Sequence, residues 1–324
     1  MKKIIPLAII VLMAFSSCMK TENPLPIEQQ EITTLQPLER KCASYEMLQE
    51  ALQEDPELKE RMQAIERFTM DYMQAPRQSA LITGGILQIP VVVNVLYRTT
   101  AENISLAQIQ SQIDVLNEDY AAVNTDYNST LTYQSVKSGD VKIRFKLDTV
   151  IRKATTKSGW TTNNAMKKTS TGGINPRSSA TKLNIWVCTL TGGVLGYAQF
   201  PGGSSATDGV VILNTAFGRS GTVKAPFHKG RTATHEIGHW LNLRHIWGDA
   251  LCGDDFVGDT PPHDNPNLGC PTTGHRSGCA GTPLEMTMNF MDYTDDACMY
   301  MFSLGQASRM QASFAIGGPR ASFR

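Results

Sequence analysis

The sequence predicts an α/β or α+β fold, in which a sheet with helices is followed by a loop-rich region linked by disulfides. Short runs of valine and isoleucine alternate with helical patterns between residues 88 and 242. Beyond about residue 246, glycine, proline, aspartate and cysteine become frequent. We therefore expect an upper and a lower half with a cleft between them.

The individual elements follow from periodicity and capping residues. We expect strands at residues 88–97, 141–147, 183–187 and 210–213, and helices within residues 41–74, 106–120, 232–242 and 306–314. Ser105 is the expected cap of the second helical region, and Asp55 before Pro56 starts a helix inside the first. Residues 75–88 resemble a linker, which divides residues 19–77 from a main domain at residues 78–324.

The chain is electrically balanced, which limits the partners that we expect. Lysine plus arginine and aspartate plus glutamate both total 30, so the formal net charge is +0. A neutral chain does not favour nucleic acid as a partner. The 324 residues are 41% hydrophobic and 19% charged, and we find no internal repeat, as in an ordinary globular protein.

The N-terminus resembles an export signal over residues 1–18. Two lysines precede an apolar run at residues 4–15, which is too short to span a bilayer as a mature helix. The run ends in Ser16-Ser17-Cys18, a pattern typical of bacterial lipoproteins, in which Cys18 would carry a lipid anchor. Cleavage by an ordinary signal peptidase remains open. Either route predicts a secreted or cell-surface protein, in which disulfides can form.

A candidate zinc site lies in the helix at residues 232–242. His235 and His239 are four residues apart and therefore project from one helix face. Glu236 is placed to accept a proton from the water that attacks a substrate. His245 can be the third ligand only if the helix ends near Asn242, a residue type that tolerates the left-handed conformation of a sharp exit.

The alternatives to a catalytic site are a chance histidine pair and a structural zinc. Three of the six histidines fall within eleven residues, which disfavours chance. A structural zinc would not need Glu236.

The motif resembles the metzincin signature, His-Glu-x-x-His-x-x-Gly-x-x-His, with Asn242 in place of the glycine. The segment Asn289–Tyr293 is similar to the methionine turn of that superfamily. Within it the chain is most similar to the pappalysin family, on residues 235–241, 259–262 and 289–293 and on the four late cysteines. The resemblance covers roughly residues 41–315.

This resemblance implies a two-lobed metzincin-type domain with a mixed sheet and an active-site helix, preceded by a helical segment that keeps a precursor latent. We call residues 19–77 the pro-segment. The resemblance implies one catalytic zinc, Met291 as an apolar floor beneath it, and Tyr293 as a contact for the metal or the oxyanion. The implied function is a zinc-dependent endopeptidase that hydrolyses internal peptide bonds of extracellular proteins or peptides.

The resemblance also implies two disulfides and a calcium site. The implied pairs are Cys252–Cys279 and Cys270–Cys298, while Cys188 is expected to be a buried free thiol. The acidic loop that carries Asp254, Asp255, Asp259 and Thr260 suits a structural calcium ion, and a solvated acidic turn is an equal alternative.

Substrate would be bound at two further places. Gly196 and Tyr197 belong to a strand that resembles the cleft strand on which substrate pairs, although an ordinary edge strand is also possible. Asp295 and Asp296 are expected near the pocket for the residue after the scissile bond. Family resemblance implies a preference for arginine there, which charge-assisted hydrogen bonds would explain.

Cys42 is a candidate fourth ligand in the latent form. Its thiolate would exclude the water that Glu236 must activate, and cutting near Pro76-Arg77 would release it. An incidental thiol, or a disulfide partner for Cys188, is the alternative.

Two other functions are alternatives. A thiol peptidase centred on Cys298 lacks any second supporting feature, and a disulfide is the better expectation for this cysteine. A non-catalytic surface lipoprotein that uses a peptidase scaffold for binding is the main alternative, and the presence of Glu236 and Tyr293 disfavours it.

Overall fold

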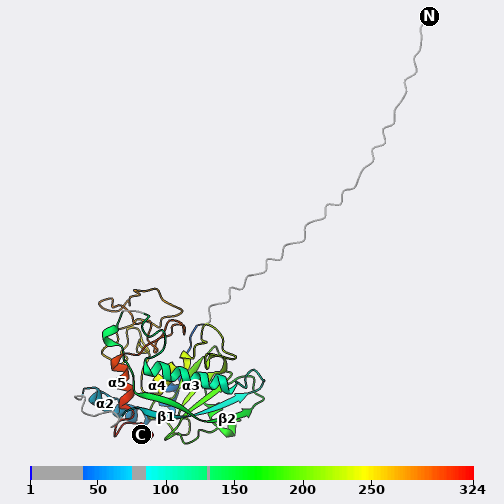
Figure 1. Ribbon diagram of the computed structural model, residues 1–324, viewed down its shortest axis with the longest axis horizontal. Helices are drawn as coiled ribbons and strands as arrows, with labels where there is room; N and C mark the ends of the chain where they lie inside the picture. The colour runs from blue at the N-terminus through cyan, green and yellow to red at the C-terminus, as the bar shows by residue number, and fades with distance from the viewer. Residues whose placement is uncertain (2–38, 75–84, 130–131) are drawn as a thin grey trace. The chain divides into compact units, whose positions relative to one another are not determined.

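The computed structural model describes Met1 and residues 39–74, 85–129 and 132–324 (Figure 1). The export signal, the polar tether and the predicted cleavage site lie outside these residues. The described helices are α1 Ser44–Glu54, α2 Leu58–Gln74, α3 Leu106–Ala121, α4 Arg231–Trp240 and α5 Leu304–Ala312, with short 3₁₀ turns at Gln134–Val136, Ala165–Lys167, Thr169–Thr171, Asn214–Ala216 and Ala321–Phe323. None of the described helices has the length and apolar character that crossing a membrane requires.

The sheet has five strands in the order β2-β1-β3-β5-β4. The strands are β1 Leu87–Tyr97, β2 Ile143–Ala154, β3 Leu183–Cys188, β4 Gly196–Ala198 and β5 Val210–Leu213. Four of them run parallel, and β4 at one edge is antiparallel to β5. Parallel strands need cover on both faces, which explains why β1 and β3 are almost wholly apolar.

Helices and loops supply that cover. One core cluster joins α3 and α4 to side chains such as Ile89, Val93 and Ile185 on one face of the sheet. The opposite face, which includes Trp186, packs against Trp160 and its neighbours in the long connection between β2 and β3. In Figure 1 α3 and α4 lie along the sheet, so the active-site helix is supported by the main core.

The predicted elements are all present, with one informative difference in length. β2 continues to Ala154, whereas the sequence pattern ended it at Leu147. The pairing partners step from Val91–Leu147 to Val92–Thr149, so Asp148 has no partner and forms a bulge. A bulge shifts the alternation of inward and outward residues by one. The alternation of inward and outward residues in the second half of β2 is therefore out of phase with that in the first half.

The pro-segment helices pack on the main domain. Glu66 on α2 accepts two hydrogen bonds from Arg309 on α5, the one from Nη1 being 2.7 Å long. Asn242 donates to Thr69 Oγ1 on α2 at 3.4 Å. The carboxylate of Asp55, between the helices, accepts from the Glu57 amide at 3.2 Å, as expected of a cap.

Two disulfides connect the loop-rich region, in the pairs that the resemblance implied. Cys252 bonds to Cys279 and Cys270 to Cys298, with Cα atoms 5.7 and 5.6 Å apart. Cys298 is therefore bonded in a disulfide and is not available as the nucleophile of a thiol peptidase. Cys42 and Cys188 are both buried free thiols, so they do not pair with each other.

We predict that replacing Cys252 and Cys279 together by serine lowers the free energy of unfolding by about 3 kcal/mol, because the bond closes a loop of 27 residues. Denaturant unfolding of the oxidised proteins measures this. An unchanged midpoint in the double variant would show that the unfolded chain is not constrained by this bond.

Candidate metal centre

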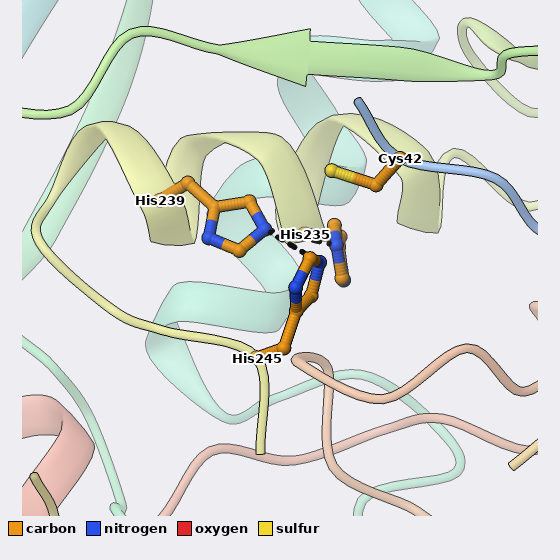
Figure 2. Close-up of side chains that lie close together, drawn as sticks. All are labelled: Cys42, His235, His239 and His245. Carbon is orange, nitrogen blue, oxygen red and sulfur yellow. Dashed lines mark hydrogen bonds between the residues drawn. The ribbon is translucent and has the colours of Figure 1, made fainter. Parts of the chain in front are cut away.

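Three histidine side chains converge at one buried point (Figure 2). The Nε2 atom of His239 lies 3.2 Å from that of His235 and 3.1 Å from that of His245. His235 and His239 come from one face of α4, as their spacing predicts. α4 ends at Trp240, and Asn242 adopts φ 74°, so the chain turns back and delivers His245.

Local hydrogen bonds determine which nitrogen of each ring carries the proton. Nδ1 of His235 faces the Phe290 carbonyl at 2.7 Å, and Nδ1 of His239 faces the Leu243 carbonyl at 2.9 Å. Carbonyl oxygens only accept, so each Nδ1 must donate and each Nε2 keeps a lone pair. Burial, together with the neighbouring imidazoles, lowers the pKa of His235 and His239 well below its usual value.

The arrangement therefore requires a cation. Neutral rings with Nε2 lone pairs 3.1–3.2 Å apart repel one another unless a positive ion lies between them. Three imidazole nitrogens with one open position form the donor set of catalytic zinc sites. These residues fit zinc on the chemistry of the chain alone.

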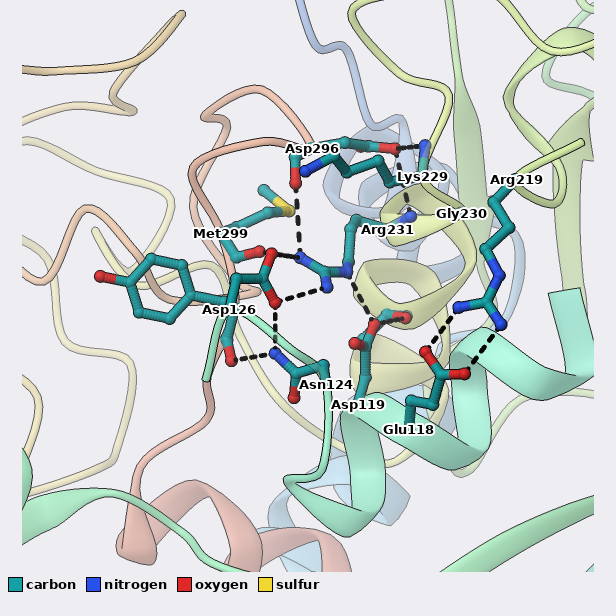
Figure 3. Close-up of polar contacts among 12 residues, drawn as sticks. Glu118, Asp119, Asn124, Asp126, Arg219, Lys229, Gly230, Arg231, Asp296 and Met299 are labelled. Atoms are coloured by element: carbon teal, nitrogen blue, oxygen red, sulfur yellow. Dashed lines mark hydrogen bonds and ion pairs between the residues drawn. The ribbon is translucent and has the colours of Figure 1, made fainter. Parts of the chain in front are cut away.

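The N-terminal end of α4 is held by a buried ionic network (Figure 3). The carboxylate of Asp296 accepts from the amides of Lys229 at 2.7 Å and Arg231 at 3.3 Å. A negative charge at a helix N-terminus is stabilising. The Arg231 side chain in turn forms ion pairs with Asp119 at 3.1 Å and Asp126 at 3.0 Å. This network sets the axial position of the helix that carries the ligands.

Cys42 completes the group around the histidines. Its sulfur and the three imidazole nitrogens lie within 4.8 Å of one another, and all four residues are buried. Burial, followed by the charge of Glu236, raises the pKa of the Cys42 thiol well above its usual value. A thiolate at this point would therefore depend on the positive charge of a bound metal.

Glu236 is enclosed on the same side. Its Oε2 accepts from the Ser44 hydroxyl at 2.9 Å and from the Cys42 thiol at 3.3 Å. Burial raises the pKa of Glu236 to about 8, and a metal cation nearby would lower it again. Gly196 lies directly behind this side chain, since a β-carbon there would come within 2.8 Å of Glu236 Cγ.

The methionine turn lies beneath the histidines. The sulfur of buried Met291 is so close to α4 that a β-carbon on Gly238 would approach it to 2.4 Å. The Tyr293 ring lies 5.0 Å from the His245 ring, and its hydroxyl donates to the Cys42 carbonyl at 3.1 Å. Both residues therefore lie close to the histidine group, and their implied roles remain predictions.

The pro-segment main chain pairs with the edge strand β4. The Leu195 amide donates to the Lys41 carbonyl at 2.9 Å, and the Ala43 amide donates to the Gly196 carbonyl at 3.0 Å. Gly196 thus contributes main-chain groups on the open side of the sheet. The Tyr197 side chain does not reach this side, because its ring is buried in the second core cluster.

The two aspartates after Tyr293 have different environments. Asp296 is fully buried and accepts from Arg40 Nη2 at 2.6 Å. Arg40 also donates to the Thr294 carbonyl at 3.1 Å and to Thr232 Oγ1 at 3.2 Å, so its charged group is fully partnered. Asp295 has no hydrogen bond to Arg40 among those observed. Of the two aspartates, Asp296 is therefore the one that is hydrogen-bonded to the Arg40 guanidinium.

The side chains of the acidic loop form hydrogen bonds within the loop and to the start of α5. Asp259 accepts from Ser303 Oγ at 2.6 Å and from the Gly305 amide at 2.8 Å, and thus caps α5. Thr260 donates to buried Asp255, whose pKa burial raises to about 7. In the described part of the chain, neither Asp254 nor Asp259 belongs to a group of three or more potential ligand side chains.

Several contacts of the candidate site could not be predicted from the sequence. Arg40 and Ser44 carried no signal besides their nearness to Cys42. Asp249, whose carboxylate is hydrogen-bonded to Nδ1 of His245, lies only four residues from that ligand, and this spacing could have suggested it.

Comparisons with known proteins agree with this geometry. The model of peptidase family M43, described as pregnancy-associated plasma protein-A, matches residues 180–315. An extracellular metalloprotease of Pyricularia oryzae is 34% identical over 254 residues, covering 74% of this chain and 77% of that protein. Extracellular metalloprotease 1 of Coccidioides posadasii is 31% identical over 244 residues, covering 70% of this chain and 78% of that protein.

Solved structures of mirolysin from Tannerella forsythia extend the comparison. A promirolysin mutant is 40% identical with a TM-score of 0.78, covering 88% of this chain and 97% of that one. Mature mirolysin with a cleaved peptide is 43% identical with a TM-score of 0.71, covering 74% of this chain and 96% of that one. The fold is therefore of the metzincin type. The chain belongs to peptidase family M43, the pappalysins, and is a zinc metalloendopeptidase made as a precursor.

Proposed function

We propose that this endopeptidase cleaves extracellular proteins or peptides at the metal centre of His235, His239 and His245, and that residues 40–44 hold the precursor latent. The observation that carries the proposal is the position of the pro-segment. It occupies the edge of β4, the open side of the histidine group and the carboxylate of Glu236 at once. The residues that catalysis would need are the residues that the pro-segment covers.

The catalytic roles follow from the same contacts. Zinc at the three histidines would polarise the scissile carbonyl and lower the pKa of water, as in other zinc peptidases. Glu236, adjacent to this point, would accept the proton of the attacking water and pass it to the leaving amine. Tyr293 now donates to the Cys42 carbonyl, and it would donate to a substrate carbonyl oxygen in the same place.

We predict that Glu236→Gln lowers kcat on a protein substrate by about 10²- to 10⁴-fold while zinc content stays at one per chain. The change removes the proton acceptor and preserves the shape of the side chain. Activity assays and metal analysis of the matured proteins measure the two effects, with His245→Ala as the control that should lose both. Full activity in the Gln variant would refute the role of Glu236. Zinc binding without cleavage by the wild type would favour the alternative of a non-catalytic binding protein.

We predict that Gly196→Ala lowers kcat by up to about 10²-fold, because its β-carbon would displace Glu236. Zinc content of the matured protein should be unchanged, since Gly196 carries no ligand atom and the three histidines are kept. Gly258→Ala is a matched control, because nothing lies within 4 Å of the new β-carbon. Equal activity in both variants would show that Glu236 tolerates displacement.

Latency would rest on three separate contacts of the pro-segment. Cys42 lies at the open position of the histidine group, Ser44 donates to Glu236, and Arg40 pairs with Asp296. Together they would exclude water, mask the proton acceptor and fill a substrate pocket. Main-chain pairing with β4 adds a fourth restraint. Cleavage between residues 75 and 84, which include Pro76-Arg77, would separate the pro-segment from the domain at residues 78–324.

We predict that the Cys42→Ala precursor becomes active, or processes itself, sooner than wild type, because the open metal position is no longer filled. A time course of processing and activity at equal protein concentration tests this. Cys188→Ala is the matched control, since Cys188 is the other buried free thiol and lies away from the histidines. If the Cys42 variant stays as latent as wild type, the helices block the cleft sterically instead.

The pocket at Asp296 predicts a preference for arginine directly after the scissile bond. Arg40 shows that a guanidinium group fits against this carboxylate, with Phe227 4.9 Å below it. We expect Asp296→Asn to reduce the ratio of kcat/KM for matched arginine and leucine peptides by about tenfold or more. Asp295→Asn, which removes a charge that is not hydrogen-bonded to Arg40 and acts on it only through space, should reduce the ratio much less. If the wild-type enzyme shows no preference for basic residues at this position in a peptide library, this proposal is wrong.

Two further predictions concern calcium and the membrane. A structural calcium at Asp254, Asp259 and Thr260 would require Asp259 to share its oxygens with the start of α5, and metal analysis after dialysis against calcium tests it.

The relatives named as extracellular support secretion. A lipid anchor on Cys18 stays a prediction that the mass of the mature N-terminal peptide can test.

A further inference from the structure

We propose that Asp249 and Trp247 together position His245 as a metal ligand, and that the carboxylate of Asp249 raises the affinity of the site for zinc. Asp249 is a positioning residue in this proposal, since it acts through His245. The inference rests on the proposed metal centre and concerns a pair of residues outside the signature motif.

His245 differs from the other two ligands in what holds it. His235 and His239 are fixed by α4, and their Nδ1 atoms face uncharged carbonyl oxygens. His245 comes after the helix has ended and has no helix to orient it. Its Nδ1 faces the carboxylate of Asp249, whose side chain is only 9% exposed. Among the three ligands described, only His245 has an anionic partner at Nδ1.

The loop after His245 is shaped to make this contact. The Gly248 amide donates to the His245 carbonyl at 2.9 Å, which closes a tight turn. Gly248 and Asp249 both adopt left-handed conformations, with φ 65° and 59°. A β-carbon on Gly248 would come within 2.4 Å of the Asp254 amide nitrogen, so only glycine fits. Two successive left-handed residues bring the Asp249 side chain back to the ring four residues earlier.

Trp247 restrains the same ring from its face. The two ring planes are 7° from parallel and their centroids are 4.3 Å apart. The edge of Trp247 also contacts Tyr293, with centroids 4.7 Å apart. His245 is therefore restricted in rotation by stacking and in tilt by the Asp249 hydrogen bond. A stacked ring and a fixed Nδ1 leave Nε2 aimed at His239 Nε2, 3.1 Å away.

The carboxylate adds an electronic effect to this geometry. A hydrogen bond from Nδ1–H to an anion increases electron density at Nε2 and makes it a better donor to a cation. The effect is strong here because His245 is buried and only 9% of the Asp249 side chain is exposed. Removing such a partner weakens metal affinity by about 10- to 100-fold in zinc proteins generally.

Two substitutions of Asp249 separate charge from backbone shape in the full-length precursor. Asparagine tolerates φ 59° and keeps an accepting oxygen without the charge, and glycine tolerates φ 59° without any acceptor. Asp114→Asn, at an exposed position on α3, is the control for loss of one negative charge. Zinc affinity is measured by competition with a chromophoric chelator at constant pH, and the visible spectrum of the cobalt-substituted protein reports ligand geometry.

We expect Asp249→Gly to bind zinc about 10- to 100-fold more weakly, Asp249→Asn to be intermediate, and Asp114→Asn to match wild type. The cobalt spectrum should change in the Gly variant. If Asp249→Asn binds zinc as tightly as wild type, the charge of Asp249 has no role. This comparison decides the point even if the Gly variant fails to fold. Equal losses of thermal stability in the metal-free and metal-bound Gly variant would overturn the proposal in favour of a purely structural residue. A wild-type chain that binds no zinc would instead refute the proposed metal centre.

Discussion

The mutual repulsion of three buried imidazole lone pairs is the constraint on which the rest of this structure depends. The Nε2 atoms of His235, His239 and His245 are brought to within 3.1–3.2 Å, where only a shared cation makes the arrangement favourable. Each surrounding feature serves to hold that geometry. The core supports α4, Asn242 ends it, and Met291 closes the space beneath. A bound cation would therefore stabilise the folded state, because the unfolded chain does not bring the three rings together.

Asp296 connects the stability of the site to its recognition of basic groups. Its carboxylate accepts from two amides at the start of α4 and from the side chain of Arg40. Loss of Arg40 on maturation would leave this buried charge short of one partner, and an arginine of a substrate would replace it. The same anion thus stabilises the active-site helix, receives the pro-segment and would select substrate. One buried charge can serve all three because its oxygens face both the helix terminus and the cleft.

The proposed latency would be distributed over the short segment at residues 40–44. Its main chain bonds to Leu195 and Gly196, and the side chains of Arg40, Cys42 and Ser44 contact Asp296, the histidine group and Glu236 in turn. Arg40 and Cys42 lie just before α1, and Ser44 is the first residue of that helix, so the turn into α1 brings the Ser44 hydroxyl to Glu236. α2 adds an anchor on α5 through the ion pair of Glu66 with Arg309. Removal of one contact therefore need not release the others.

The sequence by itself determined the features that depend on local spacing. His235 and His239 share a helix face because they are four residues apart, and the left-handed exit at Asn242 follows from where His245 must lie. The tertiary structure alone decided contacts between distant segments. Arg40 meets Asp296 across 256 positions, Ser44 meets Glu236 across 192, and Ser303 at the start of α5 meets Asp259 across 44. Periodicity and capping act within a few residues, whereas the partner of a buried charge is set by how whole elements pack.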